Sequence, residues 1–187
     1  MMKHYAYQSP FRMVDEEGNN YKLIIEQDDI SENPREWSNL ATMICFYKRY
    51  DLGDKHNYDG VHEMLEDLAE EIGLEYEGKN TPDLMTELSP YYCIKPLYLY
   101  DHSGITISTS DGHPYNDRWD AGCIGFAYIS KEKAIANSVD VKENWQKYAS
   151  KCIDSEVQTY DQYLTGEVYG YKLEKEVTIE EKCPHWR

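Results

Sequence analysis

Residues 94–109 decide the fold of this chain, and they read IKPLYLYDHSGITIST. Two β-prone runs flank a turn at 101–104, which is made of aspartate, histidine, serine and glycine. After the turn, Ile105 and Ile107 alternate with polar residues, which is the pattern of a strand with one buried face. The stretch therefore predicts a β-hairpin, whose two strands run antiparallel.

Further strands are predicted on both sides of this hairpin. An apolar run at 123–129 follows a polar loop, and 167–173 is expected to form a last strand. Upstream, 11–14 and 21–27 flank a turn-rich segment and predict another hairpin. The apolar run 40–47 could be a central strand or a buried helix, because its periodicity favours neither.

Two longer segments predict helices. The first spans 59–72 with apolar residues at helical spacing, and Asp59 could cap its start while Gly73 could end it. The second spans 141–166, and a shorter helix starts at 130–134. Strands interrupted irregularly by helices predict an α+β fold, with a mainly antiparallel sheet and two or three packed helices.

The charge of the chain is its strongest global signal. It has 187 residues, 35 acidic against 19 basic side chains and a net charge of −16. The length predicts a single acidic α+β domain over 1–187, in which 51–90 could form an inserted subdomain. That segment holds 12 acids against two lysines. Such a field attracts basic surfaces and repels nucleic-acid phosphates and anionic membranes, so little direct nucleic-acid binding is expected.

The helix predicted at 59–72 is the best candidate for binding a partner. Acids fill the face opposite its apolar residues, although such a face can also be only a solvated surface. Tyrosine and tryptophan side chains could add interface anchors. The candidate partner-binding residues are Asp51, Asp54, Asp59, Glu63, Glu66, Asp67, Glu70, Glu71, Glu75, Glu77, Tyr100, Asp101, His102 and Trp119.

The turn at 101–104 is the segment whose residue types are most typical of a catalytic site. A carboxylate beside an imidazole, Asp101 and His102, could support general acid–base catalysis. Adjacent residues of a strand point to opposite faces, however, so a turn held by Asp101 is the simpler interpretation. The sequence shows no zinc or calcium spacing and no phosphate-binding glycine loop. We expect no catalytic residue, no metal and no cofactor.

The cysteines and the apolar runs bear on the compartment. The five cysteines are widely spaced and form no CxxC pair, which indicates free thiols in a reducing compartment. Residues 1–14 lack the apolar core of a signal peptide, and the longest apolar runs are too short to span a bilayer. We therefore expect a soluble, cytoplasmic protein.

Several segments of the chain carry a family resemblance: NPREWSNL at 33–40, RYDLGD at 49–54, PLYLYDHSGIT at 96–106, Trp119 and Asp120 with Gly122 and Gly125, SKEKA at 130–134 and YDQYLTGEVYGY at 160–171. They resemble a family of small proteins from bacteriophages and from mobile elements of gut bacteria. Some members of this family look like anti-CRISPR proteins, which inhibit type II RNA-guided effector nucleases. The end of the chain, 181–187, departs from the family pattern, and no catalytic residues carry over.

The resemblance implies a partner, a type II CRISPR effector nuclease with its guide RNA, in the cytoplasm of the bacterial host cell. Such a nuclease holds nucleic acid in a positively charged channel, which an acidic domain could occupy as a DNA mimic. Inhibition would then block DNA binding or cleavage without catalysis. Two alternatives stay open. One is a nuclease-like enzyme that acts on guide or host RNA, and the other is an acidic inhibitor of another host DNA-handling enzyme, such as a restriction enzyme.

Overall fold

The structure is a computed structural model that describes residues 10–101, 104–110, 121–138 and 143–178. These residues form two compact units. The larger is Glu32–Thr165, and the smaller consists of the described residues up to Ser31 and from Gly166 onward. The acidic segment 51–90 lies entirely within the larger unit. The expected single domain over 1–187 stays a prediction.

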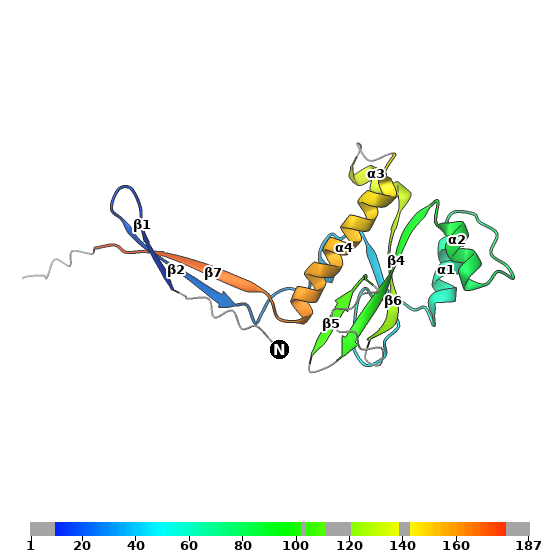
Figure 1. The fold of residues 1–187 in the computed structure, drawn as a ribbon, viewed down its shortest axis with the longest axis horizontal. Coiled ribbons are helices and arrows are strands. Elements are labelled where there is room, and N and C mark those ends of the chain that lie inside the picture. Colours follow the sequence, from blue (N-terminus) through cyan, green and yellow to red (C-terminus); the bar gives the residue numbers. More distant parts are fainter. Residues whose placement is uncertain (1–9, 102–103, 111–120, 139–142, 179–187) are drawn as a thin grey trace, which may run out of the picture. The chain divides into compact units, whose positions relative to one another are not determined.

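The larger unit is built on a four-stranded antiparallel sheet (Figure 1). β4 (Tyr92–Asp101) and β5 (Ile105–Ser108) form the predicted hairpin. β6 (Ala121–Ser130) pairs with the other side of β4, and β3 (Thr42–Cys45) pairs with β6. The order of the strands across the sheet is therefore β3-β6-β4-β5.

The strand β3 resolves the ambiguity of the apolar run 40–47. Met43 and Cys45 belong to the hydrophobic core on one face of the sheet, whereas Ile44 belongs to the core on the other face. A strand that is buried on both faces shows no alternation between apolar and polar residues. This is why the periodicity of the sequence could not distinguish a strand from a buried helix.

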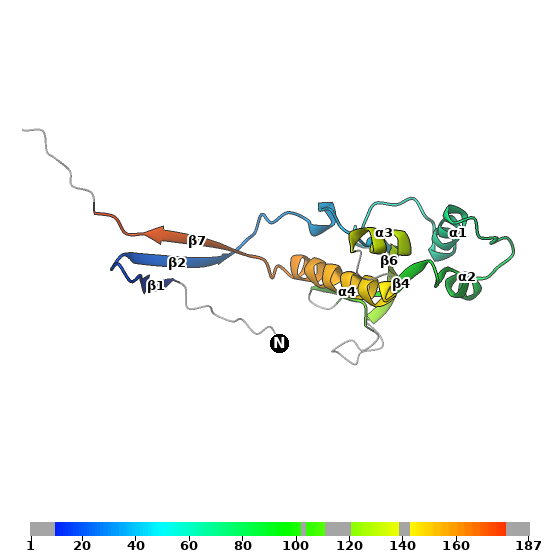
Figure 2. The ribbon, with the colours of Figure 1, turned by 90° about the horizontal axis from the view of Figure 1, so that it is seen from above.

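Helices cover both faces of this sheet (Figures 1 and 2). α1 (Val61–Glu71) and α2 (Thr81–Leu88) pack on one face, and α3 (Lys131–Asn137) and α4 (Trp145–Leu164) pack on the other. The predicted fold class, α+β with mainly antiparallel sheets, is confirmed, and the described residues contain four α-helices. Within the same described residues, no helix has the length and apolar character needed to cross a bilayer.

The start of α1 differs from the prediction, and its end does not. The N-cap is Gly60 rather than Asp59, and no side chain caps the helix there; the carboxylate of Glu63 reaches back and accepts the backbone N–H of Asp59 at 2.6 Å. An acid in the first turn also suits the positive end of the helix dipole. Gly73 follows the helix with a φ of 70°, the left-handed conformation expected of a glycine that ends a helix.

The helix α2 has no counterpart among the predicted helices, although local signals mark its start. The side chain of Asn80 accepts the backbone N–H of Asp83 at 3.0 Å, and Pro82 lies in the first turn. The helix has eight residues and buries only Leu84 and Leu88. Two apolar positions are too few to show a helical period, so only the cap could have revealed this helix.

The smaller unit is a three-stranded antiparallel sheet in the order β1-β2-β7. β1 (Phe11–Val14) and β2 (Asn20–Gln27) form the predicted hairpin, and β7 (Tyr169–Lys175) pairs with the other side of β2. Asp15 holds the turn, because its carboxylate accepts hydrogen bonds from both the side-chain amide and the backbone N–H of Asn19. These bonds lower the pKa of Asp15.

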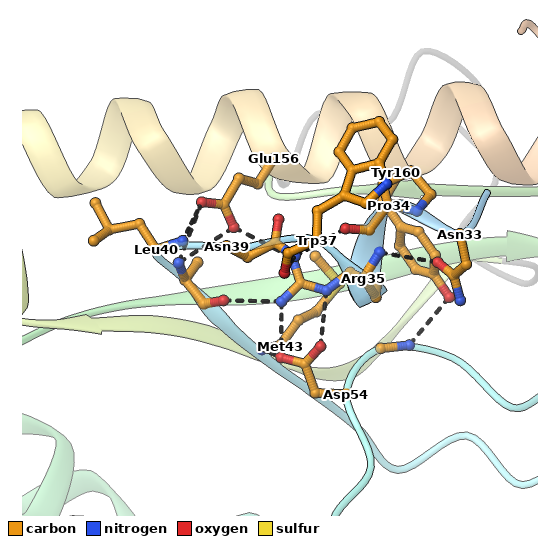
Figure 3. A network of polar contacts seen from close by, with 12 residues as sticks. Asn33, Pro34, Arg35, Trp37, Asn39, Leu40, Met43, Asp54, Glu156 and Tyr160 are labelled. Atoms are coloured by element: carbon orange, nitrogen blue, oxygen red, sulfur yellow. Dashed lines mark hydrogen bonds and ion pairs between the residues drawn. The ribbon is translucent and has the colours of Figure 1, made fainter.

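A buried arginine joins distant segments of the larger unit (Figure 3). The side chain of Arg35 is only 4% exposed, and it donates to both carboxylate oxygens of Asp54 at 2.9 and 2.7 Å. It also donates to Glu156 at 3.2 Å and to the carbonyl of Ala41 at 2.8 Å. Glu156 in turn accepts the backbone N–H of Leu40 at 2.8 Å. The network therefore links the chain before β3, the loop that holds Asp54, and α4.

We predict that Gly125→Ala destabilises the larger unit. A Cβ at Gly125 would collide with the carbonyl oxygen of Ile44 and would lie 2.8 Å from the Cα of Cys45, so β3 and β6 would have to separate. The free energy of unfolding should fall by about 3 kcal/mol, as measured by urea unfolding. The matched control is Gly122→Ala on the same strand, where a Cβ meets nothing within 4 Å. Equal losses in the two variants would contradict this close packing.

Candidate partner-binding surface

The helix α1 is held by its apolar face and presents acids on the other. Met64, Leu65, Leu68 and Ala69 are buried in the core between α1, α2 and the sheet. The opposite face carries Glu63, Glu66, Asp67, Glu70 and Glu71, all of them exposed or partly exposed. We call these five residues the α1 acids. The predicted acidic face therefore exists, and the helix that carries it is packed against α2 and the sheet.

Two of the α1 acids are bound by tyrosine hydroxyls from neighbouring segments. The hydroxyl of Tyr58 donates to Asp67 at 2.6 Å, and that of Tyr92, at the start of β4, donates to Glu71 at 2.8 Å. The hydrogen bond to Asp67 raises the pKa of Tyr58, and burial together with the bond to Glu71 raises the pKa of Tyr92. These hydroxyls are neutral, so they fix the carboxylates in place without cancelling their charge.

Two further α1 acids are also oriented by near neighbours. Glu63 accepts the backbone N–H of Asp59, as described above, which again leaves the carboxylate charged. The Nε2 of His62 lies 3.4 Å from an oxygen of Glu66 one turn along the helix, which is an ion pair only when the histidine is protonated. The side chain of Asp59 is exposed beside the start of α1.

Asp54 has a different position from the rest of the candidate residues. Its carboxylate binds Arg35 and also accepts the backbone N–H of Met43 at 2.8 Å, and its side chain is 25% exposed. Both of its oxygens are therefore used inside the larger unit. Sequence reasoning grouped Asp54 with the acids of the 51–90 segment, because Arg35 lies 19 residues earlier and shows no local pairing pattern.

The remaining acids of the set are exposed. Within 51–90, all of which the structure describes, the side chains of Asp51, Glu70, Glu75 and Glu77 make no hydrogen bond and no ion pair with another described residue. Of the 12 acids in this segment, only Asp54 and Glu87 pair with an arginine or a lysine of the described residues, the latter with Lys79 at 2.6 Å. The segment therefore keeps most of its negative charge.

The predicted residues around the hairpin turn lie apart from the α1 acids. Asp101 ends β4, where it accepts hydrogen bonds from Arg49 at 2.8 Å and from the hydroxyls of Tyr47 and Tyr50 at 3.3 Å each. The carboxylate of Asp101 raises the pKa of Arg49. These three donors occupy both oxygens of Asp101 and come from the segment after β3, so the carboxylate joins the end of β4 to that segment. Asp101 and Tyr92 are nine residues apart on one strand, or about 30 Å.

The other candidates near the turn have little described structure. Tyr100 is partly exposed on β4 and pairs with Thr106 across the hairpin. His102 and Trp119 lie outside the described residues. The structure therefore brings together the α1 acids on one helix, with Asp59 beside its start, and does not bring Asp101 next to them.

The described part of the chain contains no group of three or more histidine, cysteine, aspartate or glutamate residues that could hold a metal ion. Its cysteines are free: Cys45 is buried, Cys93 and Cys152 are partly buried and Cys123 is exposed. Burial raises the pKa of the Cys45 thiol to about 12, so this thiol stays protonated and unreactive at neutral pH.

Comparisons of the chain with models of protein families, with curated proteins and with solved structures find no match.

Sequence reasoning missed the residues that hold the acids in place. Tyr58 and Tyr92 lie 9 and 21 residues from the carboxylates they bind, and only the packing of α1 on β4 brings Tyr92 to Glu71. The large number of tyrosines in the chain, 18, was the one available signal, because a tyrosine in a packed region needs a partner for its hydroxyl.

We predict that the larger unit loses stability as the pH rises above about 10, the ordinary pKa of a tyrosine. The raised pKa values of Tyr58 and Tyr92 mean that the folded state keeps two protons that the unfolded state releases. The double variant Tyr58→Phe and Tyr92→Phe should therefore show a shallower decline of the urea midpoint between neutral and alkaline pH. The control Tyr91→Phe removes an exposed hydroxyl and should keep the wild-type decline. Parallel declines in all three proteins would contradict the assigned hydrogen bonds.

Proposed function

We propose that this chain is an anti-CRISPR protein of a phage or mobile element, which binds a type II CRISPR effector nuclease with its guide RNA. One observation supports the proposal most. Four of the five α1 acids, all but Glu70, are oriented by neutral hydroxyls, by a backbone N–H or by a histidine, rather than by lysine or arginine. Their geometry is fixed while their charge is retained. A surface of this kind suits a basic partner that normally holds phosphates.

The density of charge on α1 is comparable to that of a nucleic acid. Glu63 and Glu71 are eight residues apart, which corresponds to about 12 Å along a helix. Five carboxylates spread over this length have a mean spacing of about 3 Å, compared with about 1.7 Å per charge for duplex DNA and 3.4 Å for one of its strands. The acids of α1 therefore form a line of negative charge similar to the one that a nucleic-acid-binding groove is built to bind.

The expected partner has such a groove. RNA-guided effector nucleases hold the guide and its target in a positively charged channel and read the adjacent motif with arginines. Occupation of that channel, or of its entrance, by the α1 acids would block DNA binding or cleavage by exclusion. The mechanism requires no catalytic residue, metal or cofactor of this chain, and it acts in the cytoplasm of the bacterial host cell.

The test is a charge reversal that spares the acids used by the fold. The variant Glu66→Lys, Glu70→Lys and Glu75→Lys changes exposed or partly exposed carboxylates of the acidic segment, none of which pairs with a lysine or an arginine among the described residues. We predict that it binds the guide-loaded nuclease at least about tenfold more weakly and no longer protects target DNA from cleavage, a loss of about 1.4 kcal/mol or more. Binding of the wild-type chain should weaken steeply as salt is raised.

The matched control is Glu36→Lys, Glu132→Lys and Glu143→Lys, which changes the net charge by the same amount at exposed acids outside 51–90. It should bind and inhibit like the wild type. Normal inhibition by the α1 variant would show that this face is only solvated. Guide RNA and target DNA recovered from the complex should be intact, and degradation of either one would favour an enzyme instead.

A further inference from the structure

The two sheets differ in whether the outward backbone groups of their edge strands form hydrogen bonds with other described residues. In the larger unit, the backbone N–H of Ile107 on the edge strand β5 donates to the carboxylate of Asp161 at 2.8 Å. On the opposite edge strand β3, the N–H of Met43 donates to the carboxylate of Asp54 at 2.8 Å, and its carbonyl accepts the N–H of Asp54 at 2.7 Å. Acidic residues of the same unit therefore cap both edges of this sheet.

The edge strand β7 of the smaller unit directs alternate backbone groups away from its sheet. Just before the strand, the carbonyl of Val168 accepts the N–H of Asp28 at 2.9 Å, and just after it the N–H of Glu176 donates to Asn20 at 2.9 Å. Even-numbered residues of this segment therefore face β2. In an antiparallel strand the alternate residues face the other way, so the odd-numbered ones direct their N–H and C=O groups outward.

These outward groups belong to an unprotected edge. No described residue forms a hydrogen bond with the outward backbone groups of Tyr171, Leu173 or Lys175. The strand is seven residues long, contains no proline, and pairs with β2 in a continuous register without a bulge. It also lies at the edge of the sheet in Figure 2. Proteins normally avoid such edges, because they are templates for pairing with another strand.

One face of the same sheet is apolar. The register places Phe11 beside Leu23 and Leu23 beside Leu173, and all three side chains point to one face. Tyr171 and Leu173 are 81% and 56% exposed on that face. The opposite face is polar, and there Lys22 and Lys172 both pair with Glu174, at 3.2 and 2.8 Å. Three strands with an apolar face are about the smallest sheet that is stable on its own, so added strands would stabilise it.

We propose that β7 pairs antiparallel with β7 of a second copy of this chain, about a two-fold axis at Lys172, to form a continuous six-stranded sheet. In this register Tyr171 lies opposite Leu173 of the second copy, and both belong to the hydrogen-bonded pairs formed by the outward groups. Because odd residues pair with odd residues, the apolar faces of the two sheets join into one. Lys172 lies opposite the second copy's Lys172, and the diagonal ion pairs from each of these lysines to Glu174 of the other copy offset their repulsion.

A second copy fits this edge better than a basic partner does. The apolar face carries no aspartate or glutamate on β7, and the strand YGYKLEK holds two lysines against one glutamate. A basic surface would therefore meet lysines here, whereas the acids that attract it lie on α1. The strand matches its own copy in the alternation of its faces, and its lysine and glutamate at 172 and 174 can pair across the axis, as a two-fold interface requires. This inference does not depend on the proposed function.

The oligomeric state of the full chain in solution tests the proposal. Sedimentation velocity over a wide range of concentration should give a species of twice the 22.0 kDa of one chain. Leu173→Pro removes an outward N–H that β2 does not use and should leave a monomer. The matched control Val177→Pro changes an exposed apolar residue just beyond the strand and should remain a dimer. A wild-type chain that is monomeric throughout the range would overturn the proposal.

Cross-linking keeps the test valid if Leu173→Pro disturbs the small sheet. In a background with Cys123→Ser and Cys183→Ser, Lys172→Cys would place two thiols at the two-fold axis. Residues opposite each other in a non-hydrogen-bonded pair have Cα atoms about 4.5 Å apart, within the range of a disulfide. Mild oxidation should therefore give a covalent dimer, whereas Lys22→Cys on the central strand should not. Equal yields from the two variants, or protection of the edge amides in a monomer, would overturn the pairing.

Discussion

The larger unit depends on the burial of one guanidinium group. The guanidinium of Arg35 is almost completely buried, where an unpaired charge would cost several kcal/mol. Two carboxylates and a backbone carbonyl accept its hydrogen bonds. Burial alone would lower the pKa of Arg35, but the bonds to Asp54 and Glu156 more than offset this and raise it. Because Asp54 and Glu156 lie 19 and 121 residues from Arg35 along the chain, pairing the charge requires that the segment before β3, the loop before α1 and α4 assemble together.

This constraint divides the acids of the chain into two groups. Asp54, Glu156 and Asp161 bind backbone N–H groups or Arg35 inside the larger unit, so they belong to its framework. The α1 acids lie on the outer face of a helix whose inner face is buried, and no lysine or arginine among the described residues pairs with them. The acidic side chains behind the net charge of −16 therefore have two roles. Some form hydrogen bonds and ion pairs within the larger unit, and those on α1 remain available to a partner.

The sequence predicted most of the elements, and its failures have physical causes. Alternation and turn residues were enough for both hairpins, and apolar spacing was enough for α1. Periodicity failed at β3, because Met43 and Ile44 are buried on opposite faces, and at α2, which buries only two leucines in eight residues. On α4 the buried positions are Trp145, Ala149, Ile153, Val157 and Tyr160, and Tyr148 and Cys152 pack against the same core while partly exposed.

The candidate surface was predicted less completely than the fold. Local sequence is sufficient to find a charged helix face, because its members repeat every three or four residues. It does not reveal which acids are already bound, because the donors to Asp54 and Glu71 are 19 and 21 residues away in the sequence. Only the tertiary structure distinguishes a carboxylate that is bonded within the larger unit from an exposed one that could bind another molecule.

The central claim is that the buried pairing of Arg35 holds the larger unit together, and a double-mutant cycle tests it most directly. Urea unfolding would be measured for the wild type, Arg35→Met, Glu156→Gln and the double variant. The glutamine keeps an acceptor for the N–H of Leu40 and removes the charge. We predict that Arg35→Met lowers the free energy of unfolding by about 3–5 kcal/mol and that the two changes couple by at least about 1 kcal/mol. Additive losses, or a cost of Arg35→Met below about 1 kcal/mol, would contradict it.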